Sequence, residues 1–121
     1  MKTVLIVDDS AFMRRIMKKI VVKNGYKVVG EAKNGIEAIS QYKKLRADIV
    51  TLDIVMPEMG GLEALEKLVK IDPQVSVVMV SSMGQDLIVH DAIVLGAKNF
   101  ILKPFTEEQI MKAFKKVEKT N

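Results

Sequence analysis

The chain of 121 residues contains no cysteine and no tryptophan, and it has only one histidine. Without cysteine the chain cannot form disulfides, thiolate metal sites or a cysteine nucleophile. Its apolar runs are too short to cross a bilayer, and a predicted strand follows Thr3 at once, which leaves no room for a signal peptide. These absences predict a cytoplasmic protein without membrane insertion, and the length predicts a single domain over residues 1–121.

Positive charge exceeds negative charge, because 19 Lys and Arg residues outnumber 15 Asp and Glu residues and give a net charge of +4. The positive residues concentrate in 14–23 and 112–119, two predicted helical segments, where they lie opposite the apolar positions. A solvated helix face explains this pattern better than a nucleic-acid surface, since no interleaved aromatic residues support base contacts. We therefore predict no nucleic-acid partner and keep one only as a minor alternative.

Short β-favouring runs alternate with helical patterns along the whole chain. Strands are predicted at 4–7, 26–32, 49–52, 75–80 and 99–102. Helices are predicted at 10–24, 34–46, 61–71, 85–95 and 106–118. Strict alternation with helical crossovers requires a parallel sheet covered on both faces. The pattern predicts a three-layer, doubly wound α/β domain with a five-stranded parallel sheet.

Apolar spacing predicts which side of each helix packs against the sheet. In the first helix these positions are Phe12, Ile16 and Ile20, with Met13 and Met17 beside them; in the second they are Ile36, Ile39 and Tyr42; in the last they are Ile110, Phe114 and Val117. Thr106 and Gln109 predict a capping box for the last helix. The fourth helix has more apolar residues than one face can bury, so part of it is expected to be an exposed docking surface. Its His90 is expected on the surface.

Polar residues end four of the predicted strands: Asp8-Asp9, Asp53, Ser81 and Lys103. Because the carboxyl ends of parallel strands lie along one edge, these side chains can converge. Three carboxylates repel one another unless a cation lies between them, and an all-oxygen set in a shallow site suits Mg²⁺ better than Ca²⁺. A carboxylate nucleophile, Mg²⁺, a lysine and a hydroxyl are the parts that phosphoryl transfer requires, with Asp53 attacking in line.

The same residues, at the same spacing, resemble the receiver domain of two-component response regulators. The resemblance covers essentially the whole chain and rests on Asp8-Asp9, Asp53-x-x-Met56-Pro57-x-Met59-x-Gly61, Ser81 and Lys103-Pro104. Three stretches are most similar to the free-standing, CheY-like chemotaxis receivers: Asp8-Asp9-Ser10-Ala11-Phe12-Met13-Arg14, Ser82-Met83-Gly84-Gln85 and Gly96-Ala97-Lys98. The resemblance, and not the pattern of residues, implies a flavodoxin-like (CheY-like) fold with strand order 2-1-3-4-5. It also implies a single receiver domain without an output domain.

The resemblance assigns the phosphoacceptor and the metal ligands. Asp53 would accept a phosphoryl group from the phosphohistidine of a CheA-like histidine kinase. Mg²⁺ would be bound by Asp9, Asp53 and the backbone carbonyl of Val55, and by Asp8 through water. Such a chain is not an enzyme in the ordinary sense, although it catalyses its own phosphorylation and its slow dephosphorylation.

The resemblance also implies how the signal leaves the site. Lys103 would pair with the phosphoryl group, and its bond to Pro104 is expected to be cis. Ser81 would move to hydrogen-bond a phosphoryl oxygen, and Phe100, where a Tyr is often found, would turn inward into the vacated space. The surface of the fourth helix, last strand and last helix would then bind a flagellar motor switch protein or an archaeal adaptor.

At two positions beside the site this chain departs from the commonest pattern of the family it resembles: it is apolar where a polar side chain can help to position the attacking water. These positions, Val55 and Met83, lead us to expect slow self-dephosphorylation and a phosphatase partner, for example of the CheC/CheX type.

Other functions compete less well with the sequence. A single-domain receiver of another phosphorelay, in sporulation, the cell cycle or transcription control, remains the main alternative. A haloacid-dehalogenase-like phosphatase needs a second Asp two residues after the nucleophile, where this chain has Val55. A flavin mononucleotide binder needs a hydroxyl- and Gly-rich loop after the first strand, where this chain has Asp8 and Asp9.

Overall fold

The computed structural model describes residues 2–119, with the side chains of 2–118. The strands are β1 (Thr3–Val7), β2 (Lys27–Ala32), β3 (Ile49–Leu52), β4 (Val77–Ser81) and β5 (Asn99–Leu102). The helices are α1 (Ala11–Lys23), α2 (Gly35–Leu45), α3 (Gly61–Ile71), α4 (Asp86–Leu95) and α5 (Glu107–Lys119). The predicted alternation of strands and helices is confirmed, although β4 begins two residues later than predicted and includes Ser81.

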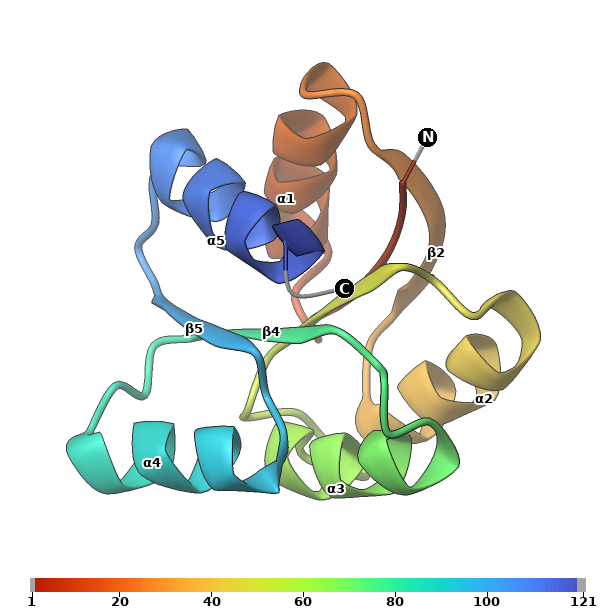
Figure 1. Cartoon of the computed structure of the whole chain (residues 1–121), viewed down its shortest axis with the longest axis vertical. Coiled ribbons are helices and arrows are strands. Elements are labelled where there is room, and N and C mark those ends of the chain that lie inside the picture. The colour runs from red at the N-terminus through yellow and green to blue at the C-terminus, as the bar shows by residue number, and fades with distance from the viewer. Residues whose placement is uncertain (1, 120–121) are drawn as a thin grey trace.

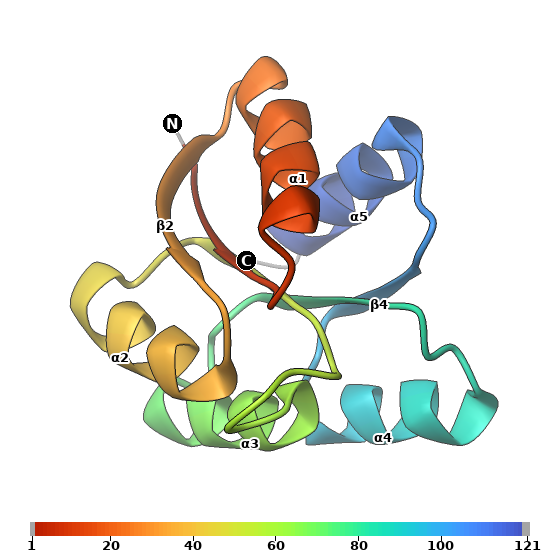
Figure 2. The ribbon, with the colours of Figure 1, turned by 180° about the vertical axis from the view of Figure 1, so that it is seen from behind.

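All five strands form one sheet in the order β2-β1-β3-β4-β5, and every pair is parallel. Helices α1 and α5 cover one face of the sheet, and α2, α3 and α4 cover the other (Figures 1 and 2). The order changes direction beside β1 and β3, which is where open α/β sheets place their ligands. The expected three-layer, flavodoxin-like fold is confirmed.

Two apolar cores lie on opposite faces of the sheet. In β1, Val4 and Ile6 pack towards α1 and α5, whereas Leu5 and Val7 pack towards α2 and α3. Both sets are fully buried, which explains why the strands read as continuous apolar runs instead of alternating ones. Burial on both faces holds the carboxyl ends of β1 and β3 in a fixed register beneath the site.

The predicted inner faces of α1 and α2 are partly wrong. Phe12 is 65% exposed, and the residues of α1 that are buried are Met17 and Val21. Two adjacent faces of α1 carry apolar residues, so periodicity did not decide which of them meets the sheet. In α2, Ile36 is 52% exposed, while Ala38 and Tyr42 are buried.

The last helix matches its sequence pattern closely. The amide of Gln109 donates to the Thr106 hydroxyl (3.2 Å), and the side chain of Gln109 accepts from the Thr106 amide (2.9 Å), so the capping box is confirmed. The inward residues Ile110, Phe114 and Val117 are buried as predicted. Across residues 2–119, no helix combines the length and the apolar character that a membrane span requires.

Candidate functional site

Two neighbouring strands bring two buried carboxylates together. Val7 of β1 pairs with Leu52 of β3, so the residues that follow them, Asp8 and Asp53, leave the sheet side by side. The Asp53 amide donates to the Val7 carbonyl (3.1 Å), which extends the pairing to the site itself. Asp8 is 6% exposed and Asp53 is 7% exposed.

The exposed Asp9 completes a cluster of three carboxylates. One oxygen from each of Asp8, Asp9 and Asp53 lies within 4.8 Å of the others. Oxygen ligands of this kind select a hard cation, and no histidine or cysteine belongs to the cluster. The donor set therefore fits Mg²⁺, as the sequence predicted.

Lys103 reaches the same cluster from the end of β5. Its Nζ lies 2.7 Å from Asp8 Oδ2 and 3.2 Å from Asp53 Oδ2. Its amide donates to the Ser81 carbonyl (2.9 Å), which ties it to the end of β4, and the Lys103–Pro104 peptide bond is cis. Three carboxylates and one ammonium leave the site with excess negative charge, which favours binding of a divalent cation.

Burial and charge act differently on the two partners of this ion pair. Burial raises the pKa of Asp53, and the Lys103 charge offsets only part of that rise because the Asp8 charge adds to it. For Lys103, burial lowers the pKa, but its hydrogen bond to Asp8 and the two carboxylate charges outweigh burial and leave the pKa above its ordinary value. Lys103 is therefore a permanent cation at neutral pH.

The loop from β3 to α3 folds tightly against the Asp53 backbone. Oδ1 of Asp53 accepts from the Ile54 amide (2.7 Å), and the Gly61 amide donates to the Ile54 carbonyl (2.7 Å). A Cβ on Gly61 would overlap the Asp53 carbonyl oxygen. The glycine of the sequence motif is thus required by this close backbone approach.

The remaining predicted residues lie around the cluster without joining it. Ser81 is buried, and its hydroxyl accepts from the Met83 amide (3.2 Å). Within residues 2–119, no hydrogen bond links this hydroxyl to Asp53 or Lys103. Phe100 is half-buried and packs against the core beneath α3 and α4. Val55, two residues after Asp53, is 60% exposed.

Sequence reasoning missed one residue that contacts the acidic turn. Arg14 was assigned to a solvated basic face, yet its side chain is only 18% exposed. Its Nη1 donates to the Asp8 carbonyl oxygen (2.6 Å), and its Nε donates to Glu31 (3.1 Å). The separation of Arg14 from Asp8 in the sequence did not predict this contact. It does not show in which direction an arginine side chain in the first turn of a helix points.

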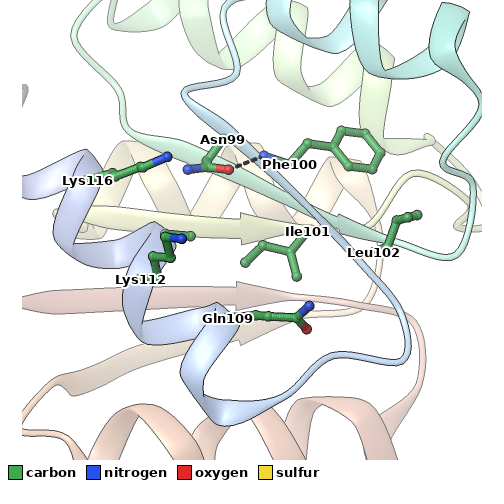
Figure 3. A pocket seen from close by; sticks show the side chains of 8 residues that line it. Asn99, Phe100, Ile101, Leu102, Gln109, Lys112 and Lys116 are labelled. Carbon is green, nitrogen blue, oxygen red and sulfur yellow. Dashed lines mark hydrogen bonds between the residues drawn. The ribbon is translucent and has the colours of Figure 1, made fainter.

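A second surface lies between α4, β5 and α5. One groove of about 290 Å³ lies along β5 and α5. Figure 3 shows Lys112 beside Ile101 and Lys116 beside Asn99, with Phe100 directed away from both lysines. An adjoining groove of about 750 Å³ also includes Val89 and Ile93 of α4.

The outer side of α4 exposes the apolar residues that the sequence predicted would exceed its buried face. Leu87 is 77% exposed, Val94 is 70% exposed and Ile93 is 48% exposed. The His90 side chain is 71% exposed, so its surface position is confirmed. An exposed apolar face next to lysine-lined grooves is a candidate binding surface.

The chain is similar to known proteins in both sequence and structure. Residues 4–115 match the response regulator receiver domain family. The chain is 52% identical to chemotaxis protein CheY of Thermotoga maritima over 118 residues, covering 98% of each chain. It is 51% identical to chemotaxis protein CheY of Bacillus subtilis over 113 residues, covering 93% of this chain and 94% of that protein. A chain in the crystal structure of the CheX-CheY-BeF3-Mg²⁺ complex from Borrelia burgdorferi matches with a TM-score of 0.95 and 36% identity, over 97% of this chain and 89% of that chain.

Proposed function

The chain belongs to the response regulator receiver domain family, and we propose that it is a chemotaxis phosphoacceptor switch. Asp53 receives a phosphoryl group from a CheA-like histidine kinase in a Mg²⁺-dependent step. The observation that carries this proposal is the meeting of Asp8, Asp9, Asp53 and Lys103 at one sheet edge. The similarity over nearly the whole chain to proteins named for chemotaxis supports the choice of pathway.

The side chains divide the work of phosphoryl transfer. A carboxylate oxygen of Asp53 attacks phosphorus as the bond to the donor imidazole nitrogen breaks, so an acyl phosphate forms and histidine leaves. Lys103, already 3.2 Å from Asp53, provides a positive charge for the incoming phosphoryl oxygens. Asp9, Asp53 and the Val55 carbonyl would hold Mg²⁺, with Asp8 acting through water. The bound ion would neutralise charge on the phosphoryl oxygens.

The output of the switch is proposed to be the α4–β5–α5 surface. Ser81 lies at the end of β4, and its hydroxyl accepts a hydrogen bond from the Met83 amide. Movement of this hydroxyl towards a phosphoryl group would break that hydrogen bond. Phe100, which packs beneath α4, would fill the vacated space and shift the exposed surface between two populations. The apolar residues and lysines of this surface suit an acidic, amphipathic segment of a motor switch protein or an archaeal adaptor.

The proposal is tested by incubating the protein with acetyl phosphate and reading its intact mass at low temperature. We expect a gain of one phosphoryl group with Mg²⁺ and no gain with a chelator. Uptake that is indifferent to the chelator would contradict the metal's role. Failure to take up phosphoryl from acetyl phosphate, phosphoramidate and a phosphorylated kinase alike would refute the phosphoacceptor function.

The phosphoryl lifetime should depend on the two apolar side chains beside the site. Changing Val55→Asn and Met83→Glu together adds groups that can position water, and we expect the lifetime to fall about tenfold. That is less than the ~10²–10⁴ that aligned acid–base groups contribute, since engineered side chains are not pre-aligned. The loss of label from phosphorylated protein measures the lifetime. The matched control is a Val55→Ala, Met83→Leu variant, which adds no polarity. An unchanged phosphoryl lifetime in the polar variant would refute the role of these two apolar side chains. It would also remove one reason to expect a CheC/CheX-type phosphatase.

The principal alternative is a receiver in another phosphorelay, which would share the same site. Binding of the phosphorylated chain to a motor switch segment, compared with a phosphotransfer protein, separates the two. A phosphatase of the haloacid-dehalogenase type is disfavoured by the apolar, exposed Val55. Such an enzyme would turn over its phosphorylated substrate instead of retaining one phosphoryl group.

A further inference from the structure

The side chain of Arg14 joins three parts of the structure behind the acidic cluster. It projects from the first turns of α1, donates through Nη1 to the Asp8 carbonyl oxygen (2.6 Å) and donates through Nε to Glu31 of β2 (3.1 Å). The Asp8 amide donates to the Ala32 carbonyl (3.0 Å), so Asp8 is also attached directly to β2. Both peptides of Asp8 are therefore held: the peptide before it by β2, and the peptide that joins it to Asp9 by Arg14.

The two aspartates of this turn are restrained to very different degrees. Asp8 is held through both carboxylate oxygens: Oδ1 accepts from the Ser10 amide (2.9 Å), and Oδ2 accepts from Lys103 (2.7 Å). Asp9 is exposed, and in the part of the chain that the structure describes its carboxylate accepts no hydrogen bond. The direction of Asp9 is thus set by the backbone that precedes it, which is the peptide whose carbonyl Arg14 holds.

We propose that Arg14 is a positioning residue that holds the Asp9 carboxylate in line with Asp8 and Asp53 and so strengthens binding of the divalent cation. The inference rests on the proposed function, because the cation is the one that this function requires. Groups that orient a metal ligand from behind typically change metal affinity 10–100-fold when they are removed.

Charge and position predict opposite results when Arg14 is replaced, which makes the inference testable. Removing a positive charge near three carboxylates should by itself strengthen cation binding slightly. Loss of the hydrogen bond to the Asp8 carbonyl should weaken cation binding, because the Asp9 carboxylate can then turn away from Asp53. Lys18 is a matched control, since it carries the same charge one turn further along α1 and lies 3.9 Å from Glu31, with its side chain 53% exposed.

The experiment is a titration with MgCl₂ alone, followed by the NMR shifts of the Asp9 and Asp53 amides under native conditions. We expect Arg14→Gln to bind Mg²⁺ about tenfold more weakly than the wild type. Lys18→Gln should bind equally or slightly more tightly. Arg14→Lys should fall between, because an ammonium can reach one acceptor but cannot bridge the carbonyl and Glu31 as the guanidinium fork does.

Phosphoryl uptake at increasing MgCl₂ separates positioning from a general loss of structure. If Arg14 acts through the cation, uptake by Arg14→Gln should return to the wild-type rate at saturating Mg²⁺. Equal Mg²⁺ affinity of Arg14→Gln and the wild type overturns the inference, as does a loss that Lys18→Gln reproduces. Should Arg14→Gln not fold, as urea unfolding would show, Arg14→Lys takes its place: it keeps the charge but cannot hold both acceptors, so weaker Mg²⁺ binding than in the wild type supports positioning and equal binding overturns it. A wild type that does not bind Mg²⁺ overturns the proposed function itself, which is a different result.

Discussion

Replacement of Asp53 by Asn should abolish the Mg²⁺-dependent gain of a phosphoryl group. A neutral amide is a poor nucleophile, and the change also removes one of three negative charges that would hold the cation. Uptake should fall by at least about 10³-fold, below detection by intact mass, since the covalent step itself is lost. The measurement is the mass of the variant after incubation with acetyl phosphate and Mg²⁺.

The loss of phosphoryl uptake must be distinguished from unfolding of the variant. The pKa of Asp53 predicts that the variant stays folded. Burial raises the pKa of Asp53, so the folded chain binds this proton more tightly than the unfolded chain does. The stability that this contributes is present at low pH and is lost as the pH rises from the ordinary value of 3.8 through the folded one. The Asp53→Asn variant cannot ionise, and Lys103 keeps Asp8 as a partner, so without metal it should be at least as stable as the wild type at pH 7.

A charge-matched control lies at the amino-terminal ends of the strands, opposite the site. Asp48 precedes β3 and accepts from the Thr3 amide (2.8 Å), far along the strand from the site. The Asp48→Asn variant should take up one phosphoryl group as the wild type does. Uptake that persists in Asp53→Asn would show that another residue is the acceptor and would contradict the proposed chemistry.

Substitution of Gly61 by Ala should cost about 3 kcal/mol of folding free energy. The new Cβ would overlap the Asp53 carbonyl oxygen, and the backbone on both sides is held by hydrogen bonds and the sheet. Forcing one extra carbon into a closely packed region typically costs about 1–3 kcal/mol, and a clash with backbone lies at the high end. Urea unfolding measures the loss, and for a domain of this size each kcal/mol lowers the Tm by about 4 °C.

The neighbouring Gly60 provides the control. A Cβ there would lie 3.1 Å from the Ile54 carbonyl oxygen, and its φ of −76° is allowed for any residue. We expect Gly60→Ala to cost less than about 1 kcal/mol. Because the Gly61 clash displaces Asp53 itself, phosphoryl uptake per folded molecule should also fall in Gly61→Ala. Equal stability of the two variants would mean that the loop relaxes freely and does not set the position of Asp53.

The candidate site was predictable to the extent that it consists of strand ends. Asp8, Asp53 and Lys103 each follow an apolar run whose identity as a strand was clear from composition, and parallel order places such residues on one edge. The contribution of Arg14 was not predictable, because a long side chain reaches several ångströms and its target depends on where β2 lies. The sequence contained Gly61 only as part of a motif. Its role became clear from the structure, in which the Asp53 backbone leaves no room for a Cβ at this position.

The sequence by itself determined the number, kind and order of the elements and the residue types at the carboxyl edge. These properties depend on contacts between residues that are close in the chain, namely apolar period, caps and turn residues. The pattern of residues alone did not yield the strand order, which was anticipated only through the family resemblance.

Only the tertiary structure decided which charges meet and which helix faces are buried. Lys103 Nζ lies 2.7 Å from Asp8 Oδ2, although the two residues are 95 positions apart in the chain. They meet because β1, β3, β4 and β5 are neighbours in that order in the sheet. Phe12 is exposed and Met17 buried because the sheet accepts one of two apolar faces of α1. Such choices follow from the packing of the whole chain, where long-range contacts override local preference.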